Sequence, residues 1–168
     1  MKHLLLVIML TIIGSKVMVA QTQTYKNESV GIGFSYPSSL HKENIKNASH
    51  MLLKLGKGDM SLALSMWAYG LDPSFSIWDE DIVQLTRDNL KRTGTSIVAI
   101  NKQTLNLKSG KRKCLISIAN DSRRSVHMVT YQFLRKGDLI QIVIMDRGAY
   151  KKQLQAQYDK YVDGLFLE

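Results

Sequence analysis

The sequence predicts an α+β domain in which an antiparallel β-sheet carries helices. Apolar and polar residues alternate in several successive runs within residues 95–145, as they do in strands with one buried face. Short clusters of Gly, Ser, Asn and Asp separate these runs, which indicates hairpin turns rather than crossovers. Residues 78–90 and 150–165 instead repeat their apolar side chains at helical spacing.

The first residues have the pattern of a secretory signal peptide. Lys2 and His3 precede an apolar run at residues 4–13, and small residues follow up to Ala20. The run is shorter than the about 20 apolar residues that a membrane span requires, and an uncleaved anchor is the alternative. We expect cleavage after Ala20, a single domain at residues 21–168 without a transmembrane span, and a secreted or periplasmic location.

The net charge indicates the class of partner, and the cysteine content excludes a disulfide within the chain. The 168-residue chain has a net charge of +9, which falls to +7 when Lys2 and Lys16 leave with the signal peptide. A basic protein favours anionic partners. Because export makes anionic lipid and acidic glycan more available than nucleic acid, we expect an envelope protein or an anionic glycan or lipid as partner, and no nucleic acid. With Cys114 as the only cysteine, no disulfide can form within the chain.

The first half of the chain predicts two strand regions and a helix. Residues 22–29 form a polar leader, residues 30–36 a strand that ends at Pro37, and residues 51–69 a hairpin around a glycine-containing turn. Ser76 and Asp79 have the spacing of a capping box, which predicts a helix start, and Gly94 predicts its end. The apolar face of this helix is expected to consist of Trp78, Ile82, Leu85 and Leu90.

The second half predicts a β-meander followed by a helix. The run at residues 139–145 is the most apolar of the meander, which indicates a central strand covered on both faces. Apolar residues from Tyr150 to Val162 then follow helical spacing. Gly164 is expected to stop this helix and to leave residues 165–167 as a short packed tail.

Catalytic motifs are not recognisable in the sequence. Cys114 lies in the middle of a predicted strand, and His41, His50 and His127 lack the spacing of metal ligands. No G-x-S-x-G element accompanies them. We therefore expect no enzymatic activity, no metal and no cofactor. The alternative is a small secreted hydrolase that uses Cys114 or a histidine.

Two groups of side chains are candidates for a binding site. Alternate turns of a meander lie at the same end of the sheet, so the cations of two turns should converge. This predicted basic edge consists of Lys108, Lys111, Arg112, Arg135 and Lys136. The other interpretation of these charges is a solvated rim. Trp67 and Tyr69 share a strand face with Trp78 nearby, and such aromatic residues either fill the core or line a groove.

Two stretches resemble a known superfamily. Residues 31–37 read Gly-Ile-Gly-Phe-Ser-Tyr-Pro, and residues 158–166 read Tyr-Asp-Lys-Tyr-Val-Asp-Gly-Leu-Phe. They are similar to the opening strand and closing helix of the superfamily of the photosystem II extrinsic protein PsbP, which also includes a nuclear Ran-binding protein and the bacterial envelope protein DcrB. Leu40 departs from the aromatic residue that relatives often carry after this proline. The resemblance implies an αβα sandwich around a central antiparallel sheet, and a non-catalytic binding or assembly module of the cell envelope.

Overall fold

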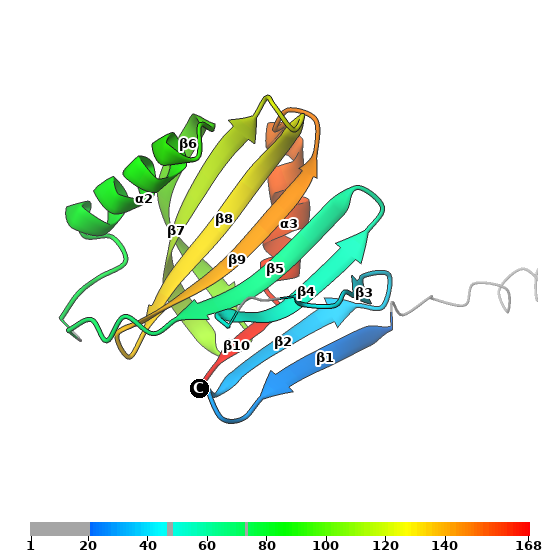
Figure 1. The fold of residues 1–168 in the computed structure, drawn as a ribbon. Helices are drawn as coiled ribbons and strands as arrows, with labels where there is room; N and C mark the ends of the chain where they lie inside the picture. Colours follow the sequence, from blue (N-terminus) through cyan, green and yellow to red (C-terminus); the bar gives the residue numbers. More distant parts are fainter. Residues whose placement is uncertain (1–20, 47–48, 73) are drawn as a thin grey trace, which may run out of the picture.

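The computed structural model describes residues 21–46, 49–72 and 74–168, which form two antiparallel β-sheets and two α-helices (Figure 1). The predicted signal peptide, residues 1–20, lies outside the described residues. Within the described ranges, the helices are too short or too polar to cross a membrane.

A seven-stranded sheet forms the centre of the fold, in the order β3-β4-β5-β9-β8-β7-β6. The predicted meander is confirmed, because β6 to β9 are consecutive in sequence and each pairs with the next in antiparallel register. The hairpin β4/β5 joins the sheet through β5, which pairs with β9 and makes β9 a central strand. The strands are β3 (His41–Lys42), β4 (Met51–Lys57), β5 (Met60–Trp67), β6 (Ser96–Leu107), β7 (Gly110–Asp121), β8 (Val126–Arg135) and β9 (Asp138–Arg147).

A second sheet of three strands was not predicted. It consists of β1 (Thr22–Asn27), β2 (Ile32–Pro37) and β10 (Leu165–Leu167), in the order β1-β2-β10. The expected polar leader is therefore a strand; its side chains are mostly exposed, so it lacks an apolar alternation. The expected C-terminal tail is also a strand. Gly164 permits its approach, because a Cβ there would meet the main-chain oxygen of Ser35.

The helices lie on opposite faces of the seven-stranded sheet (Figure 1). On one face, α3 (Gln155–Val162), preceded by the 3₁₀ turn η1 (Lys152–Leu154), packs with the three-stranded sheet into the larger core. On the other face, α2 (Glu80–Arg92) packs through Val83 against Leu115 and Leu139. The layer on the α3 face is thus part helix and part sheet.

Both helices differ in detail from the prediction. Helix α2 begins at Glu80 rather than near Ser76, because the Asp79 carboxylate accepts the backbone N–H of Ser76 at 2.8 Å and forms a turn before the helix. Leu85 is 51% exposed instead of buried, and the residues that face the sheet are Val83, Thr86 and Leu90. Helix α3 is shorter than predicted, since the chain from Tyr150 reaches it through η1.

The two faces of β9 are not equally covered. Ile140, Ile142 and Ile144 are fully buried on the α3 face. Gln141, Val143 and Met145 on the opposite face are only half-buried, because α2 lies over β6 and β7. Leu139 on this second face is buried against the α2 layer, so the prediction of a strand covered on both faces was wrong only for the rest of the face.

Candidate functional site

A groove of about 620 Å³ lies between α2 and the segment that joins β5 to α2. One wall is a stripe of α2 in which Asp81, Leu85, Asn89 and Arg92 recur at intervals of four, four and three residues, so they share one side of the helix. The remaining lining residues are Tyr69, Leu71, Phe75, Ile82, Leu134 and Leu139. The groove therefore has mostly apolar walls.

Helix α2 is fixed to the sheet beside this groove. Val83 and Leu90 are buried against the strands, and the Thr86 hydroxyl donates to Oε1 of Gln132 at 3.1 Å. A buried hydrogen bond of this kind fixes the rotation of a helix as well as its position. The stripe of α2 next to Thr86 is thereby held facing the groove.

The opposite wall is fixed by the turn between β8 and β9. The backbone N–H of Leu71 donates to the carbonyl of Gly137 at 3.0 Å. Gly137 has φ +84°, and a Cβ there would meet the main chain of Leu71, so only glycine allows this approach. Nearby, the Ser74 N–H donates to Asp72 at 2.8 Å and lowers the pKa of that carboxyl.

Exposed apolar side chains gather at the groove. Tyr69 is 54% exposed, Phe75 43% and Leu85 51%. They are three of the five large apolar side chains that are exposed among the described residues. Grouping of this kind distinguishes a binding surface from the scattered apolar residues that any protein exposes.

The aromatic candidates divide between groove and core. Trp67 stacks on His50 at 3.7 Å and on Tyr69 at 6.3 Å between ring centroids, and its indole N–H donates to Gln141. Tyr69 lines the groove. Trp78 is half-buried, packs against the smaller core and donates to the carbonyl of Cys114 at 3.0 Å. Both interpretations of the aromatic residues therefore apply, each to a different residue.

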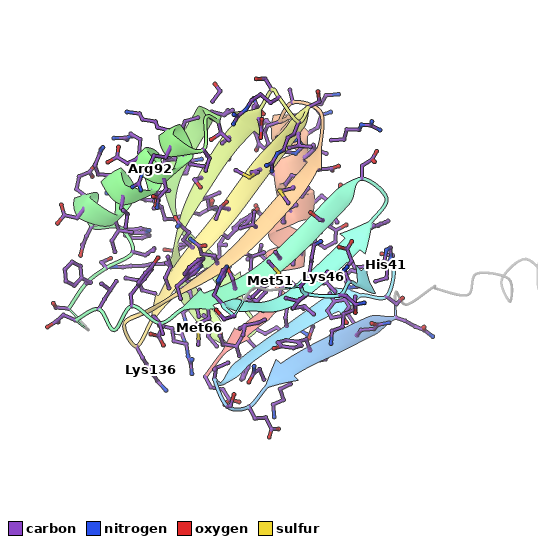
Figure 2. The ribbon with its side chains drawn as sticks, viewed as in Figure 1. His41, Lys46, Met51, Met66, Arg92 and Lys136 are labelled. Atoms are coloured by element: carbon purple, nitrogen blue, oxygen red, sulfur yellow. The ribbon has the colours of Figure 1, made fainter. Side chains whose placement is uncertain are left out.

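Part of the predicted basic edge borders the groove. The turns β6–β7 and β8–β9 lie at the same end of the sheet, as expected, because these hairpins are joined by the pairing of β7 with β8. Arg112 and Lys113 line a pocket of about 260 Å³, and Lys136 lines another of about 120 Å³. Both pockets share Phe75 and Leu134 with the groove. We call the three together the amphiphilic groove; Figure 2 labels Arg92 and Lys136, which belong to it.

The other basic-edge residues lie elsewhere. Arg135 donates to the carbonyl of Val30 at 2.5 Å and to the main-chain oxygen of Glu168 at 2.6 Å, so its guanidinium braces β8 against the three-stranded sheet. Lys108 and Lys111 are exposed and do not line the amphiphilic groove. A binding role for any residue of the basic edge stays a prediction.

The cations at the two ends of the sheet differ in their partners. At the far end, Arg123 and Arg124 pair with Asp121, and Arg147 pairs with Asp59 at 3.3 Å. Within the part of the chain that the structure describes, no ion pair involves the side chains of Lys108, Lys111, Arg112 or Lys136. These charges are available to an anionic ligand.

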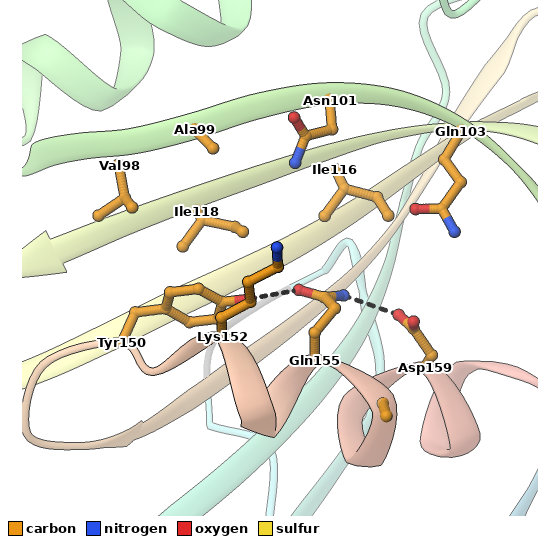
Figure 3. A pocket seen from close by; sticks show the side chains of 11 residues that line it. Val98, Ala99, Asn101, Gln103, Ile116, Ile118, Tyr150, Lys152, Gln155 and Asp159 are labelled. Atoms are coloured by element: carbon orange, nitrogen blue, oxygen red, sulfur yellow. Dashed lines mark hydrogen bonds between the residues drawn. The ribbon is translucent and has the colours of Figure 1, made fainter.

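A second cavity, of about 720 Å³, lies on the α3 face and is called the polar cavity below. Figure 3 shows its two sides: Asn101 and Gln103 come from β6, and Gln155 and Asp159 come from α3. Its lining residues are Val98, Ala99, Asn101, Gln103, Ile116, Ile118, Tyr150, Lys152, Gln155, Ala156 and Asp159. The prediction missed this cavity. Its signal in the sequence is two amides, Asn101 and Gln103, at exposed positions of β6 on the same sheet face as the buried Ile116 and Cys114.

The residues considered for a hydrolase are enclosed. Cys114 is fully buried, and burial raises the pKa of its thiol to about 12, so the thiolate nucleophile is disfavoured at neutral pH. His127 is also fully buried; its Nδ1–H donates to the carbonyl of Gly148 at 3.0 Å, and its Nε2 lies 2.8 Å from the Tyr158 hydroxyl. Neither side chain is exposed to solvent in this arrangement.

Comparison with known proteins shows the fold. No protein-family model and no curated protein matches the sequence. The solution structure of cyanobacterial PsbP from Synechocystis sp. PCC 6803 matches with a TM-score of 0.62 at 14% identity, covering 92% of this chain and 96% of that one. The Ran-binding protein Mog1p of Saccharomyces cerevisiae matches with a TM-score of 0.50 at 8% identity, covering 88% and 96%. A protein of Bacteroides thetaiotaomicron VPI-5482 matches with a TM-score of 0.53 at 10% identity over 88% of this chain, which spans only 49% of that protein.

The chain has a PsbP-like fold. This confirms the resemblance, and the structure explains why two short stretches were enough to suggest it. Residues 31–37 form β2, and residues 158–166 contain the end of α3 and the start of β10. These elements are partners in this structure, since Leu165 pairs with Phe34 and Phe166 with Gly33. The two stretches therefore contain the two strands, β2 and β10, that pair where the ends of the domain meet.

Proposed function

We propose that this protein is a secreted or periplasmic, non-catalytic binding module of the cell envelope, and that its amphiphilic groove binds an anionic lipid. The observation that carries the proposal is the meeting of exposed apolar side chains with cations that lack ion-pair partners among the described residues. A PsbP-like fold shared with a protein whose name describes it as Ran-binding supports a binding role.

The groove has one set of residues suited to the acyl chain of such a lipid and another suited to its anionic headgroup. Its volume of about 620 Å³ is within the usual range for small-molecule sites. Tyr69, Phe75 and Leu85 would cover an acyl chain, while the headgroup would meet the cations at the ends of the groove. Those cations are Arg92, Arg112, Lys113 and Lys136, and they outnumber the carboxylates of Asp72 and Asp81.

The two halves contribute differently to binding. Each buried methylene of an acyl chain contributes about 0.8 kcal/mol. Each exposed ion pair contributes about 1 kcal/mol or less and is screened by salt. Apolar contact would therefore supply most of the affinity, and the cations would select an anionic headgroup over a zwitterionic one.

Export is a premise of this proposal and has its own test. We expect protein recovered from the cell envelope to begin at Gln21, because the small residues that follow the charged start and the apolar run end at Ala20. Intact-mass measurement checks this. A recovered species that retains residues 1–20 would replace the secreted module by a membrane-anchored one.

Lipid binding is tested by co-sedimentation of the exported protein with phosphatidylglycerol vesicles and with phosphatidylcholine vesicles. We expect tighter binding to the anionic vesicles than to the zwitterionic ones, and weaker binding to the anionic vesicles as the Debye length falls from about 30 Å at 0.01 M salt to about 8 Å at 0.15 M. Equal binding to both vesicles would contradict a role for the cations. Absence of binding to either would overturn the lipid proposal and favour an envelope protein or a glycan as the partner.

A matched pair of variants tests the apolar half. Leu85→Glu places a charge in the groove, and Val98→Glu places one on β6, on the other side of the sheet, at nearly the same exposure, 51% against 49%. Because both positions are exposed, we expect both variants to fold. Leu85→Glu should abolish vesicle binding, whereas Val98→Glu should weaken it by less than a factor of three. An equal loss in both would show that the groove is not the site.

A second pair tests the basic half. We expect the double variant Arg112→Glu and Lys136→Glu to weaken binding to the anionic vesicles at least tenfold. The control reverses Lys108 and Lys111, which belong to the same basic edge but do not line the groove. If the control loses as much affinity, the charges act as a diffuse rim, and headgroup selection by the groove is wrong.

A further inference from the structure

The polar cavity exists because α3 is short. The helix has eight residues, which leaves an opening at the edge strand β6, beside Ile116 and Ile118 of β7. On this face, Asn101 lies opposite Ile116 and Gln103 lies opposite Cys114. The floor is therefore apolar toward the centre of the sheet and carries amides toward its edge.

The wall opposite those amides is held in place by a hydrogen-bond network. The Tyr150 hydroxyl donates to Oε1 of Gln155 at 2.8 Å, and Nε2 of Gln155 donates to Oδ1 of Asp159 at 2.7 Å (Figure 3). The fully buried Tyr131 donates to the same carboxylate oxygen at 2.7 Å. Burial and Asp159 together raise the pKa of Tyr131, which keeps its hydroxyl protonated as a donor. The wall is thus arranged before any ligand binds.

Other polar groups of the cavity have no partner in the protein. Among residues 21–46, 49–72 and 74–168, no side-chain hydrogen bond or ion pair involves Asn101, Gln103 or Lys152. Oδ2 of Asp159 likewise accepts none from these residues. Two carboxamides, one carboxylate oxygen and one ammonium group therefore remain for a ligand.

We propose that the polar cavity binds a hexuronic acid, a sugar ring that carries a carboxylate. Carboxamides and carboxylates both suit sugar hydroxyls, because a hydroxyl donates and accepts at once. The C–H face of the ring would pack on Val98 and Ala99, which line the cavity and keep part of their surface exposed, and Lys152 would form a charge-assisted bond with the sugar carboxylate. The volume of about 720 Å³ accommodates one or two sugar rings. This site lies on the opposite sheet face from the amphiphilic groove and does not depend on it.

The experiment titrates the purified protein with D-glucuronate, using D-glucose as the neutral control, and follows the side-chain amide signals by NMR. We expect D-glucuronate to shift the signals of Asn101, Gln103 and Gln155, and to bind at least fivefold more tightly than D-glucose. Methyl glucuronide carries the acetal of a glycan end. If it binds at least as tightly as the free acid, the site recognises a glycan terminus, and if it binds more weakly, the site recognises the free sugar acid.

Adjacent lysines provide a matched control. Lys152 lines the cavity and Lys151 does not, and both are exposed, so neither substitution should unfold the protein. We expect Lys152→Met to weaken D-glucuronate binding at least fivefold and to leave D-glucose unchanged, and Lys151→Met to change neither. The proposal is overturned if D-glucuronate shifts none of the three amide signals, or if Lys151→Met and Lys152→Met have the same effect.

Discussion

The two faces of the seven-stranded sheet are built differently, although the same strands supply both. On the α3 face, a helix and a second sheet close over Ile140, Ile142 and Ile144, and the remaining opening lies at the edge, over β6. On the α2 face, one helix covers β6 and β7, and the surface beside it stays open over β9. The closed face supplies most of the buried apolar area, while the open face provides an apolar groove.

The amphiphilic groove and the polar cavity differ in the side chains that line them. The amphiphilic groove has walls of loop and helix side chains that are exposed and apolar. The polar cavity instead has a floor of sheet residues and a wall fixed by Gln155 and Asp159. One surface offers apolar contact and the other offers directed hydrogen bonds, so the two proposed ligands would not compete for the same residues.

The largest expected difference between the faces is in stability. Ile142 and Val143 are neighbours on β9; Ile142 is fully buried on the α3 face and Val143 is half-buried on the open face. We expect Ile142→Ala to lower the free energy of unfolding by about 2–5 kcal/mol, as buried isoleucine does elsewhere. Val143→Ala should cost about 1 kcal/mol or less, because few atoms pack over it.

Urea denaturation of both variants measures this difference. Equal losses would mean that the open face is as well packed as the closed face, and that an additional layer covers it in solution. In that case the vesicle assay above would be measuring a surface that is already occupied.

The next largest effect on stability is expected at two turns, one before β9 at Gly137 and one after it at Gly148. Gly137 and Gly148 have nearly the same φ, +84° and +80°, but a Cβ at Gly137 would meet the main chain of Leu71, whereas nothing lies within 4 Å of one at Gly148. We expect Gly148→Ala to cost about 1 kcal/mol from backbone strain alone. Gly137→Ala should cost about 2–3 kcal/mol, because the strain adds to displacement of the groove wall.

Thermal unfolding and vesicle binding separate these two costs. Only Gly137→Ala should weaken phosphatidylglycerol binding, since Leu71 and Phe75 would move with the wall. If Gly148→Ala weakens binding equally, the loss comes from general destabilisation and not from the groove.

The sequence predicted those elements whose signal lies in neighbouring residues, and missed those that depend on a distant part of the chain. The meander and the β4/β5 hairpin were predicted because alternation and turn residues lie next to each other in the chain. Strand β1 was missed because it is held by pairing with β2 and has no buried face of its own. Strand β10 was missed because its partner lies more than a hundred residues away, where Leu165 pairs with Phe34.

Local pattern also decided which residues of the candidate groove the sequence could indicate, while their role in binding stays a prediction. Tyr69, Arg112 and Lys136 were identified from strand parity and turn position, and they border the amphiphilic groove. Leu85 was assigned to the core because helical spacing cannot distinguish a side chain that packs on a sheet from one that lines a groove beside it. Arg135 was grouped with the basic edge, but its partners Val30 and Glu168 come from a sheet that was not predicted.

The smallest effect distinguishes two neighbours on β7. Lys113 is exposed toward the α2 face, with its ammonium 4.8 Å above the Trp78 ring, while Cys114 is fully buried toward the α3 face. Burial raises the pKa of the Cys114 thiol from 9.0 to about 12. Above pH 9 the unfolded chain releases this proton while the folded protein retains it, so folding stability is complete below pH 9 and falls as the pH rises toward 12. At pH 10 the thiol should lower the free energy of unfolding by about 1.4 kcal/mol.

The variant Cys114→Ala isolates this contribution. Burial also raises the pKa of Tyr131 and Tyr158, so the parent and the variant should both lose stability at still higher pH. Between pH 8 and pH 10, however, the parent should lose about 1.4 kcal/mol more than the variant, because only the parent carries the thiol. Urea denaturation across this range measures the two slopes. Parallel slopes would mean that water reaches Cys114 in the folded state. The α3 face would then not be closed to water, and the proposed difference between the two faces would be wrong.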